Sequence, residues 1–137
     1  LSGANLSGFN LRGAIFIGAN LSEANLSWSF LNQADLTGAD LKRADLRSAS
    51  FNGANLTSSK LSGANLSKID LRMAQMEGAD LNWATLQEAD MGGVNLNGAK
   101  LDRGNLERAK LNGAQLFRAE LMEANLRRAN LSGANLD

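Results

Sequence analysis

A five-residue repeat runs through the whole chain and restricts its fold more than any other feature. Large apolar residues occupy all 28 positions from residue 1 to residue 136 in steps of five, and 24 of them are leucine. The position two residues before this apolar residue is alanine in 21 of 27 cases, and the position just before it is Asn or Asp in 17 of 27. The frame never slips, so residues 1–137 are expected to form a single solenoid domain with no linker.

Neither a helix nor a continuous strand can bury this pattern on one side. Five residues turn an α-helix by about 500°, which scatters the leucines around its circumference, and on a strand the odd step places Leu1 and Leu6 on opposite faces. Within one unit, however, Ala and Leu lie two residues apart, as on a strand. Each unit is therefore predicted to be a short extended side, with Ala and Leu inward, followed by a two-residue turn. Twelve of the 14 glycines occupy the second turn position, where a type II turn has positive φ.

Four such corners close a square, so the sequence predicts about seven coils of 20 residues, with four pentapeptides in each coil and a rod about 33 Å long. A 20-residue step places Phe9 over Ser29, a large residue over a small one. It also predicts a cation–π contact and an ion pair in one corner column, made by Trp83, Arg103 and Glu123. One outward column is expected to alternate in charge along the rod: Asn20, Asp40, Lys60, Asp80, Lys100 and Glu120.

The uninterrupted A-(N/D)-L-x-x repeat resembles the pentapeptide-repeat proteins. The resemblance implies an all-β fold, the right-handed quadrilateral β-helix, with Leu or Phe inward and the Ala two residues earlier also inward. Many members occur in cyanobacteria, and most have no known biochemical activity. A better-understood group mimics double-stranded DNA and binds DNA gyrase, using an acidic surface and usually a dimer formed through a C-terminal helix.

This chain differs from that group in both respects. It has 14 acidic and 14 basic residues, its last third is mildly basic, and it ends within the repeat at Leu136 and Asp137. We therefore expect a non-catalytic structural or protein-interaction module with a protein partner or a flanking domain. A gyrase-binding DNA mimic remains the alternative, and the neutral charge disfavours it.

The residue types give no support for a catalytic, metal or cofactor site, and the chain is predicted not to be an enzyme. It has no His and no Cys, and its regularly spaced Asn and Asp residues are those that favour turns. Asp35, Asp40 and Asp45 fall on three successive sides of the square, so they diverge. Zero net charge argues against nucleic-acid binding. No apolar run is long enough to span a membrane, so no membrane contact by this segment is expected. A cytoplasmic location is favoured, with any membrane tether left to flanking sequence.

The departures from the repeat fall into two groups. One group occupies inward positions and is expected to adjust core packing: Phe9, Phe16, Phe51, Ile69, Met76, Met91 and Val94. The other breaks the polar rule at outward positions of the first two coils and is predicted to form one exposed apolar interaction patch: Ile15, Ile17, Trp28 and Phe30. A capping element or a missing upstream segment is the favoured cover, and an independent partner or a homodimer is the alternative.

The chain begins at Leu1 in mid-pattern and shows no cap at either end. We therefore expect residues 1–137 to be part of a longer chain. The ends of the solenoid are expected to be covered by flanking sequence or by copies stacked end to end.

Overall fold

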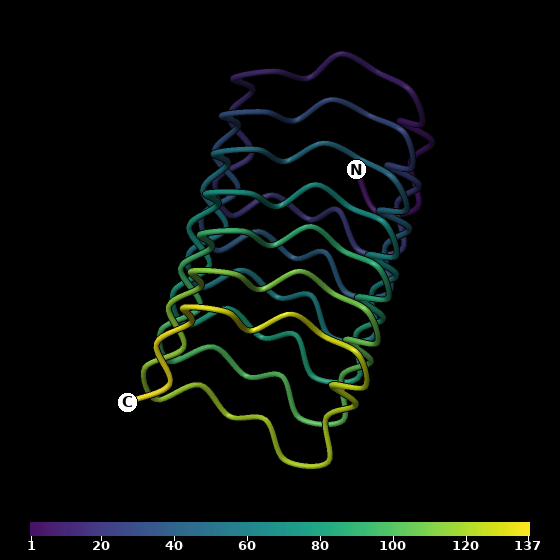
Figure 1. The fold of residues 1–137 in the computed structure, drawn as a ribbon. Helices are drawn as coiled ribbons and strands as arrows, with labels where there is room; N and C mark the ends of the chain where they lie inside the picture. Colours follow the sequence, from purple (N-terminus) through teal and green to yellow (C-terminus); the bar gives the residue numbers. More distant parts are fainter.

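The computed structural model describes residues 1–137 and shows a rod of stacked coils, which runs from the purple N-terminal end to the yellow C-terminal end in Figure 1. Every fifth residue from Asn5 to Asn135 forms a parallel β-bridge, and two turn residues lie between successive bridge residues. These bridges are isolated, so no strand extends beyond one bridge residue, and no helix is present. Accordingly, the structure contains no helix that could cross a bilayer. The fold is an all-β solenoid.

Successive coils are in register at a constant offset of four repeat units. The bridges pair Asn5 with Asn25 at one end and Gln115 with Asn135 at the other, with the same offset throughout. In a representative rung, the N–H of Leu6 donates to the carbonyl of Asn25 at 2.7 Å, and the N–H of Asn25 donates to the carbonyl of Ala4 at 2.9 Å. Four bridge residues therefore fall in one coil, as the sequence predicts, and these backbone hydrogen bonds connect successive coils along the rod.

Each corner is a tight turn whose second residue has positive φ. The N–H of Ala4 donates to the carbonyl of Leu1 at 3.0 Å across Ser2 and Gly3, and the same bond recurs along the chain. Twelve of these second residues are glycine, with φ between 63° and 72°. The other 15 are not glycine, yet they have φ between 55° and 62°. The stack therefore imposes one corner geometry, even on side chains that disfavour left-handed backbone.

The Asn and Asp residues before the leucines serve the corners. Each of them accepts, through Oδ1, a hydrogen bond from the N–H of the first corner residue two positions later. This Asx-type bond pairs an N–H that the coil-to-coil ladder leaves free. The regular carboxylates and amides of the sequence therefore have a structural role.

Where the repeat lacks Asn or Asp, a corner side chain from the preceding coil takes over at three positions. Lys100, Gln115 and Glu120 stand at bridge positions and make no such bond to the corner that follows. The corner N–H groups there donate instead to side chains one coil earlier: Asp102 to Asn82 at 2.9 Å, Phe117 to Asn97 at 3.0 Å and Met122 to Asp102 at 2.8 Å.

The core is a stack of inward leucine and alanine side chains. Thirty-six buried residues between Leu21 and Leu116 form one cluster. Phe16 packs against this cluster while partly buried. The other inward departures, apart from Phe9, lie within the cluster, as predicted: Phe51, Ile69, Met76, Met91 and Val94.

One expectation needs correction, and one confirmed column has an unexpected feature. Phe9 occupies an inward position of the repeat but is 54% exposed, because it lies in the first coil, which packs against a neighbouring coil on one side only. The charged column from Asp40 to Glu120 has the predicted register, but its members form no ion pair with one another. Asp80 instead accepts hydrogen bonds from the hydroxyl of Ser62 at 2.6 Å and the N–H of Asn82 at 3.1 Å.

Candidate interaction surface

The four residues predicted to form an apolar patch are all outward and exposed. Ile15 is 76% exposed and Trp28 is 65% exposed, and Ile17 and Phe30 are also open to solvent. The bridges of Ile15 with Asp35 and of Phe30 with Ser50 place these two side chains on adjacent sides of the rod. The structure thus provides two exposed apolar pairs, Trp28 with Phe30 and Ile15 with Ile17.

A basic side chain lies beside the first of these pairs. Arg12 occupies the corner between the two sides, and its guanidinium lies 4.7 Å from the centroid of the Phe30 ring. It also donates to Asn10 Oδ1 at 3.2 Å. The cation therefore lies over part of the Phe30 ring, and a single interaction patch of these four residues stays a prediction.

Trp28 borders a shallow surface hollow of about 270 Å³, lined by Trp28, Arg47, Ser48, Ser67 and Lys68. Trp28 is a second corner residue with φ of 61°. Arg47 is held by its own coil, because its Nε donates to Asp45 Oδ1 at 2.8 Å. Lys68 forms no ion pair. The hollow therefore combines an exposed ring with one unpaired cation.

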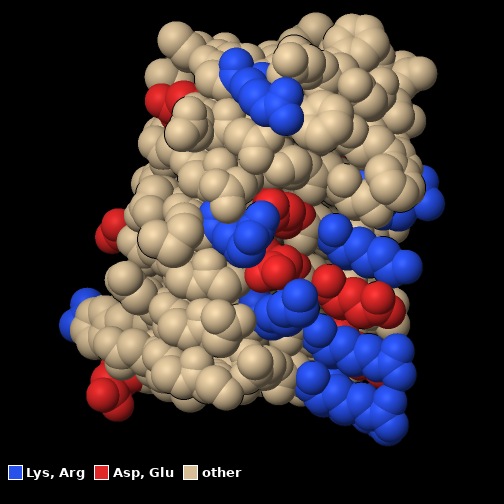
Figure 2. All heavy atoms as spheres, turned by 45° about the horizontal axis from the view of Figure 1, so that its top comes forward, with Lys and Arg blue, Asp and Glu red and all other residues tan.

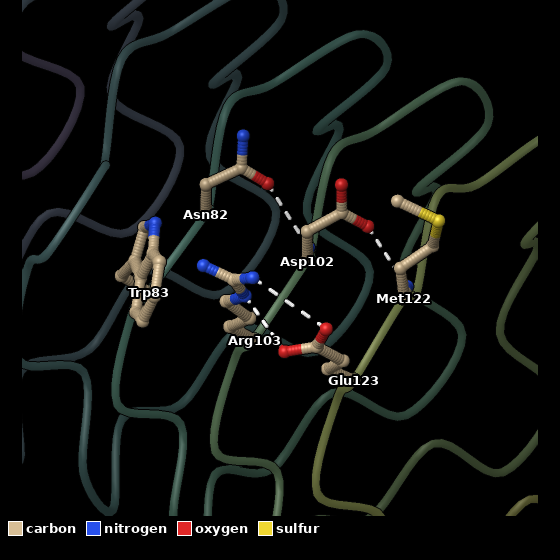
Figure 3. Close-up of a pocket in the computed structure, with 6 residues that line it drawn as sticks. All are labelled: Asn82, Trp83, Asp102, Arg103, Met122 and Glu123. Carbon is tan, nitrogen blue, oxygen red and sulfur yellow. Dashed lines mark hydrogen bonds and ion pairs between the residues drawn. The ribbon is translucent and has the colours of Figure 1, made fainter.

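The second tryptophan corner is filled by side chains of the chain itself (Figure 3). The Arg103 guanidinium lies 4.6 Å from the centroid of the Trp83 ring, and Arg103 Nε donates to Glu123 Oε2 at 2.8 Å. Both predicted contacts of this column are confirmed. Asn82, Asp102 and Met122 form the neighbouring column, and together the two columns line a hollow of about 190 Å³.

Several carboxylates accept hydrogen bonds from corner residues or pair with neighbouring arginines. The hydroxyl and N–H of Thr37 donate to Asp35 and lower the pKa of its carboxyl. Arg47 lowers the pKa of Asp45, and Arg72 lowers that of Asp70, in each case mainly through a side-chain hydrogen bond. No group of three or more acidic residues could hold a metal ion. The carboxylates with lowered pKa values are thus engaged by neighbouring side chains of the chain itself.

Charge is distributed unevenly along the rod. Figure 2 shows basic and acidic side chains interleaved on the lower part of one face, whereas the end turned toward the reader is almost free of charge. Residues 1–34 contain only Arg12 and Glu23 as charged residues. The apolar pairs thus lie in the least charged region of the chain.

Two features of this surface were missed from the sequence. The Arg12–Phe30 contact joins residues of neighbouring columns, so the stacking of each column on itself does not reveal it. The Trp28 hollow was also missed, although Trp28, Ser48 and Lys68 share one corner column. Serine is a common corner residue in this chain, so Ser48 does not stand out in the sequence as the place where a hollow forms.

Comparison with known proteins agrees with this architecture. The family model of pentapeptide repeats matches the chain in four segments, at residues 1–38, 34–72, 74–113 and 101–137. The chain belongs to the pentapeptide-repeat family. No significant match is found among curated proteins.

Two solved structures of the family resemble the chain. A pentapeptide-repeat protein of the Arabidopsis thaliana thylakoid lumen has a TM-score of 0.69 at 31% identity, covering 70% of this chain and 67% of that one. Trypsin-treated QnrB1, a plasmid-mediated fluoroquinolone resistance protein, has a TM-score of 0.91 at 22% identity, covering 98% of this chain and 68% of that one. The likeness to QnrB1 is one of fold.

Proposed function

We propose that this pentapeptide-repeat chain is a non-catalytic module that binds a protein partner. The observation that supports this is the group of exposed apolar side chains Ile15, Ile17, Trp28 and Phe30 on the first two coils. Outward positions of the repeat are otherwise mostly polar, and exposed apolar groups of this kind mark contact sites. In its finer architecture, we take residues 1–137 as one right-handed four-sided solenoid of about seven coils.

A gyrase-directed DNA mimic is the weaker proposal. Mimicry of DNA needs a continuous acidic face, because the phosphate backbone carries dense negative charge. Here, basic side chains interrupt the acidic ones on the face shown in Figure 2, and Lys110 Nζ lies 3.3 Å from Asp90. Gyrase supercoiling is therefore expected to be unchanged by low micromolar amounts of the chain; inhibition or protection would favour the mimic.

The interaction proposal is tested with a photo-reactive amino acid at position 15 or position 30. Positions 75 and 115 serve as controls, because Gln75 and Gln115 lie in the same column as Ile15 but on later coils. Cross-links to one protein from positions 15 and 30, and not from the controls, would support the proposal. The purified partner should then bind the chain and lose affinity for the Ile15→Asn, Ile17→Ser double variant.

Light scattering on the chain and on this double variant separates a partner from a second copy. A dimer that dissociates on substitution would identify the partner as another copy of the chain. An unchanged oligomeric state together with no position-specific cross-link would refute the interaction proposal.

A further inference from the structure

The two tryptophans occupy equivalent corners but have different neighbours. Both are second corner residues with φ of 61° and 62°, a conformation in which a bulky side chain is disfavoured. Trp28 is 65% exposed and Trp83 is 60% exposed. Each has a surface hollow beside it, and the residue one coil further on lines that hollow. The size and charge of this residue therefore determine whether the chain itself contacts the ring.

At Trp83 the chain supplies that contact. Arg103, one coil on, places its guanidinium over the ring, and Glu123, two coils on, pairs with Arg103. The negative face of an indole ring favours such a cation. In this column the cation contacts the aromatic ring on one side and an anion on the other, so its charge has partners within the chain.

In the Trp28 column, a serine stands where the Trp83 column has Arg103, and a lysine stands where it has Glu123. Ser48 follows one coil on, and its short side chain leaves part of the hollow of about 270 Å³ open. Lys68 follows two coils on and has no acidic partner. Glu88, the next residue of this column, lies 4.0 Å from Arg108.

The surroundings of this hollow are basic. The Arg47–Asp45 pair contributes no net charge, so Lys68 leaves the lining with one excess positive charge. Arg12 adds a second positive charge beside the neighbouring Phe30 ring. An acidic ligand is therefore attracted to this corner. Its carboxylate would avoid the negative face of the indole, and an aromatic or apolar group fits there better.

We propose that the Trp28 hollow binds an acidic peptide segment of a partner protein. One aromatic side chain of the segment stacks on Trp28, and a neighbouring carboxylate pairs with Lys68. The two anchor positions lie two rungs apart, about 10 Å, which suits an aromatic residue and an acidic residue close together in one peptide. This inference rests on the proposed function, since it specifies the chemistry of the partner.

A random-peptide display library, selected on the full chain, tests the inference. Binders are depleted on the Trp28→Gly variant, which removes the ring and gives the corner the residue that its positive φ favours, so this variant is expected to fold. Trp83→Gly makes the same change at the filled corner and is the matched control. Enriched peptides are expected to carry Asp or Glu within two residues of Phe, Tyr or Trp.

Affinities of the enriched peptides then measure each anchor. We expect Trp28→Gly to weaken binding about thirtyfold, as for a central aromatic anchor, and Lys68→Gln to weaken it about fivefold, with less effect at high salt. Trp83→Gly and Lys100→Gln should leave binding unchanged. In the Trp83→Phe background, the fluorescence of Trp28 should change with the same saturation curve.

Three outcomes would overturn the inference: no Trp28-dependent enrichment, enriched peptides without acidic residues, or equal losses for Trp28→Gly and Trp83→Gly. Peptides that depend on Ile15 and Ile17 but not on Trp28 would refute this inference while supporting the proposed function. Peptide binding that depends on none of the four exposed apolar residues would count against both the inference and the proposed function. These residues are Ile15, Ile17, Trp28 and Phe30.

Discussion

The two ends of the rod share one backbone geometry but differ in the number of charged residues on their surfaces. The segment 1–34 contains two charged side chains, whereas the segment 100–137 contains 12. The first coils expose large apolar residues with little charge around them, among them Ile15, Ile17 and Trp28, whereas the exposed Phe117 and Met122 of the later segment lie among charged side chains. Yet the bridges, the corner angles and the inward leucines continue unchanged from one region to the other. The inward positions and the corners therefore determine the fold, and the outward positions are free to differ.

The largest expected effect separates an inward from an outward phenylalanine. Phe51 is fully buried, whereas Phe30 is 41% exposed. Phe51→Ala should lower the free energy of unfolding by about 3–5 kcal/mol, because it removes core contacts and leaves a cavity. Phe30→Ala should cost less than about 1 kcal/mol. Urea denaturation followed by circular dichroism measures both, and similar losses would show that the outward positions also determine stability.

A second pair of variants tests the corner geometry. Gly38 has φ of 65° and no atom within 4 Å of the position that a Cβ would take, so Gly38→Ala adds only backbone strain, about 1 kcal/mol. Met73 has φ of 59°, and Met73→Gly should raise the midpoint of thermal unfolding by relieving similar strain. If both substitutions destabilise the chain, the strain argument for non-glycine corners is wrong.

The hydrogen bonds between corners of successive coils are expected to contribute no more to the free energy of unfolding than the corner strain does. Asn97 accepts from the N–H of Phe117, and Asn97→Ala should cost about 1 kcal/mol by leaving that donor unpaired. The control is Asn112→Ala, because Asn112 is also a first corner residue and its side chain makes no hydrogen bond within the chain. Equal unfolding midpoints for the two variants would contradict a stabilising role for the Asn97 bond.

The smallest effect concerns pH. Arg47 and Arg72 lower the pKa values of Asp45 and Asp70 below the ordinary 3.8. Both carboxylates therefore stabilise the fold above that pH, and this stability is lost as the pH falls through their folded-state pKa values. Asp45→Asn with Asp70→Asn keeps side-chain oxygens that can cap the corners, and should flatten the stability curve below about pH 4 by less than about 1 kcal/mol. The free energy of unfolding, measured by urea denaturation at a series of pH values, checks this. The same pH dependence below about pH 4 in the double variant and the original chain would refute the prediction.

The sequence predicted the fold because the five-residue period excludes regular helices and strands. The same register correctly placed Trp83, Arg103 and Glu123 in contact. Side-chain direction was harder to predict. The charged column of Asp40, Lys60, Asp80 and Lys100 lies in register without ion pairs. Asp40 and Asp80 accept from the N–H of the adjacent corner, whereas Asp90 does the same and also pairs with Lys110 one coil on. The register of a column therefore does not specify which of its charges form ion pairs.

The candidate surface was predicted in part. Outward Ile15, Ile17, Trp28 and Phe30 are exposed as expected, but the position of Arg12 over the Phe30 ring was not foreseen. That contact depends on a side chain reaching sideways between columns, which the repeat does not encode. The exposure of Phe9 likewise reflects the number of neighbouring coils, which an inward position alone does not specify.

The register of four repeat units per coil has a consequence for how such a chain can change in length. A duplication of one whole coil lengthens the rod and preserves every column. A duplication of a single pentapeptide preserves every inward leucine but turns all later side chains by a quarter of a revolution. One pentapeptide inserted between Trp83 and Arg103, for example, would move Arg103 to the next corner and leave the core intact. Surfaces on this fold can therefore be recombined in quarter turns, without any redesign of the interior.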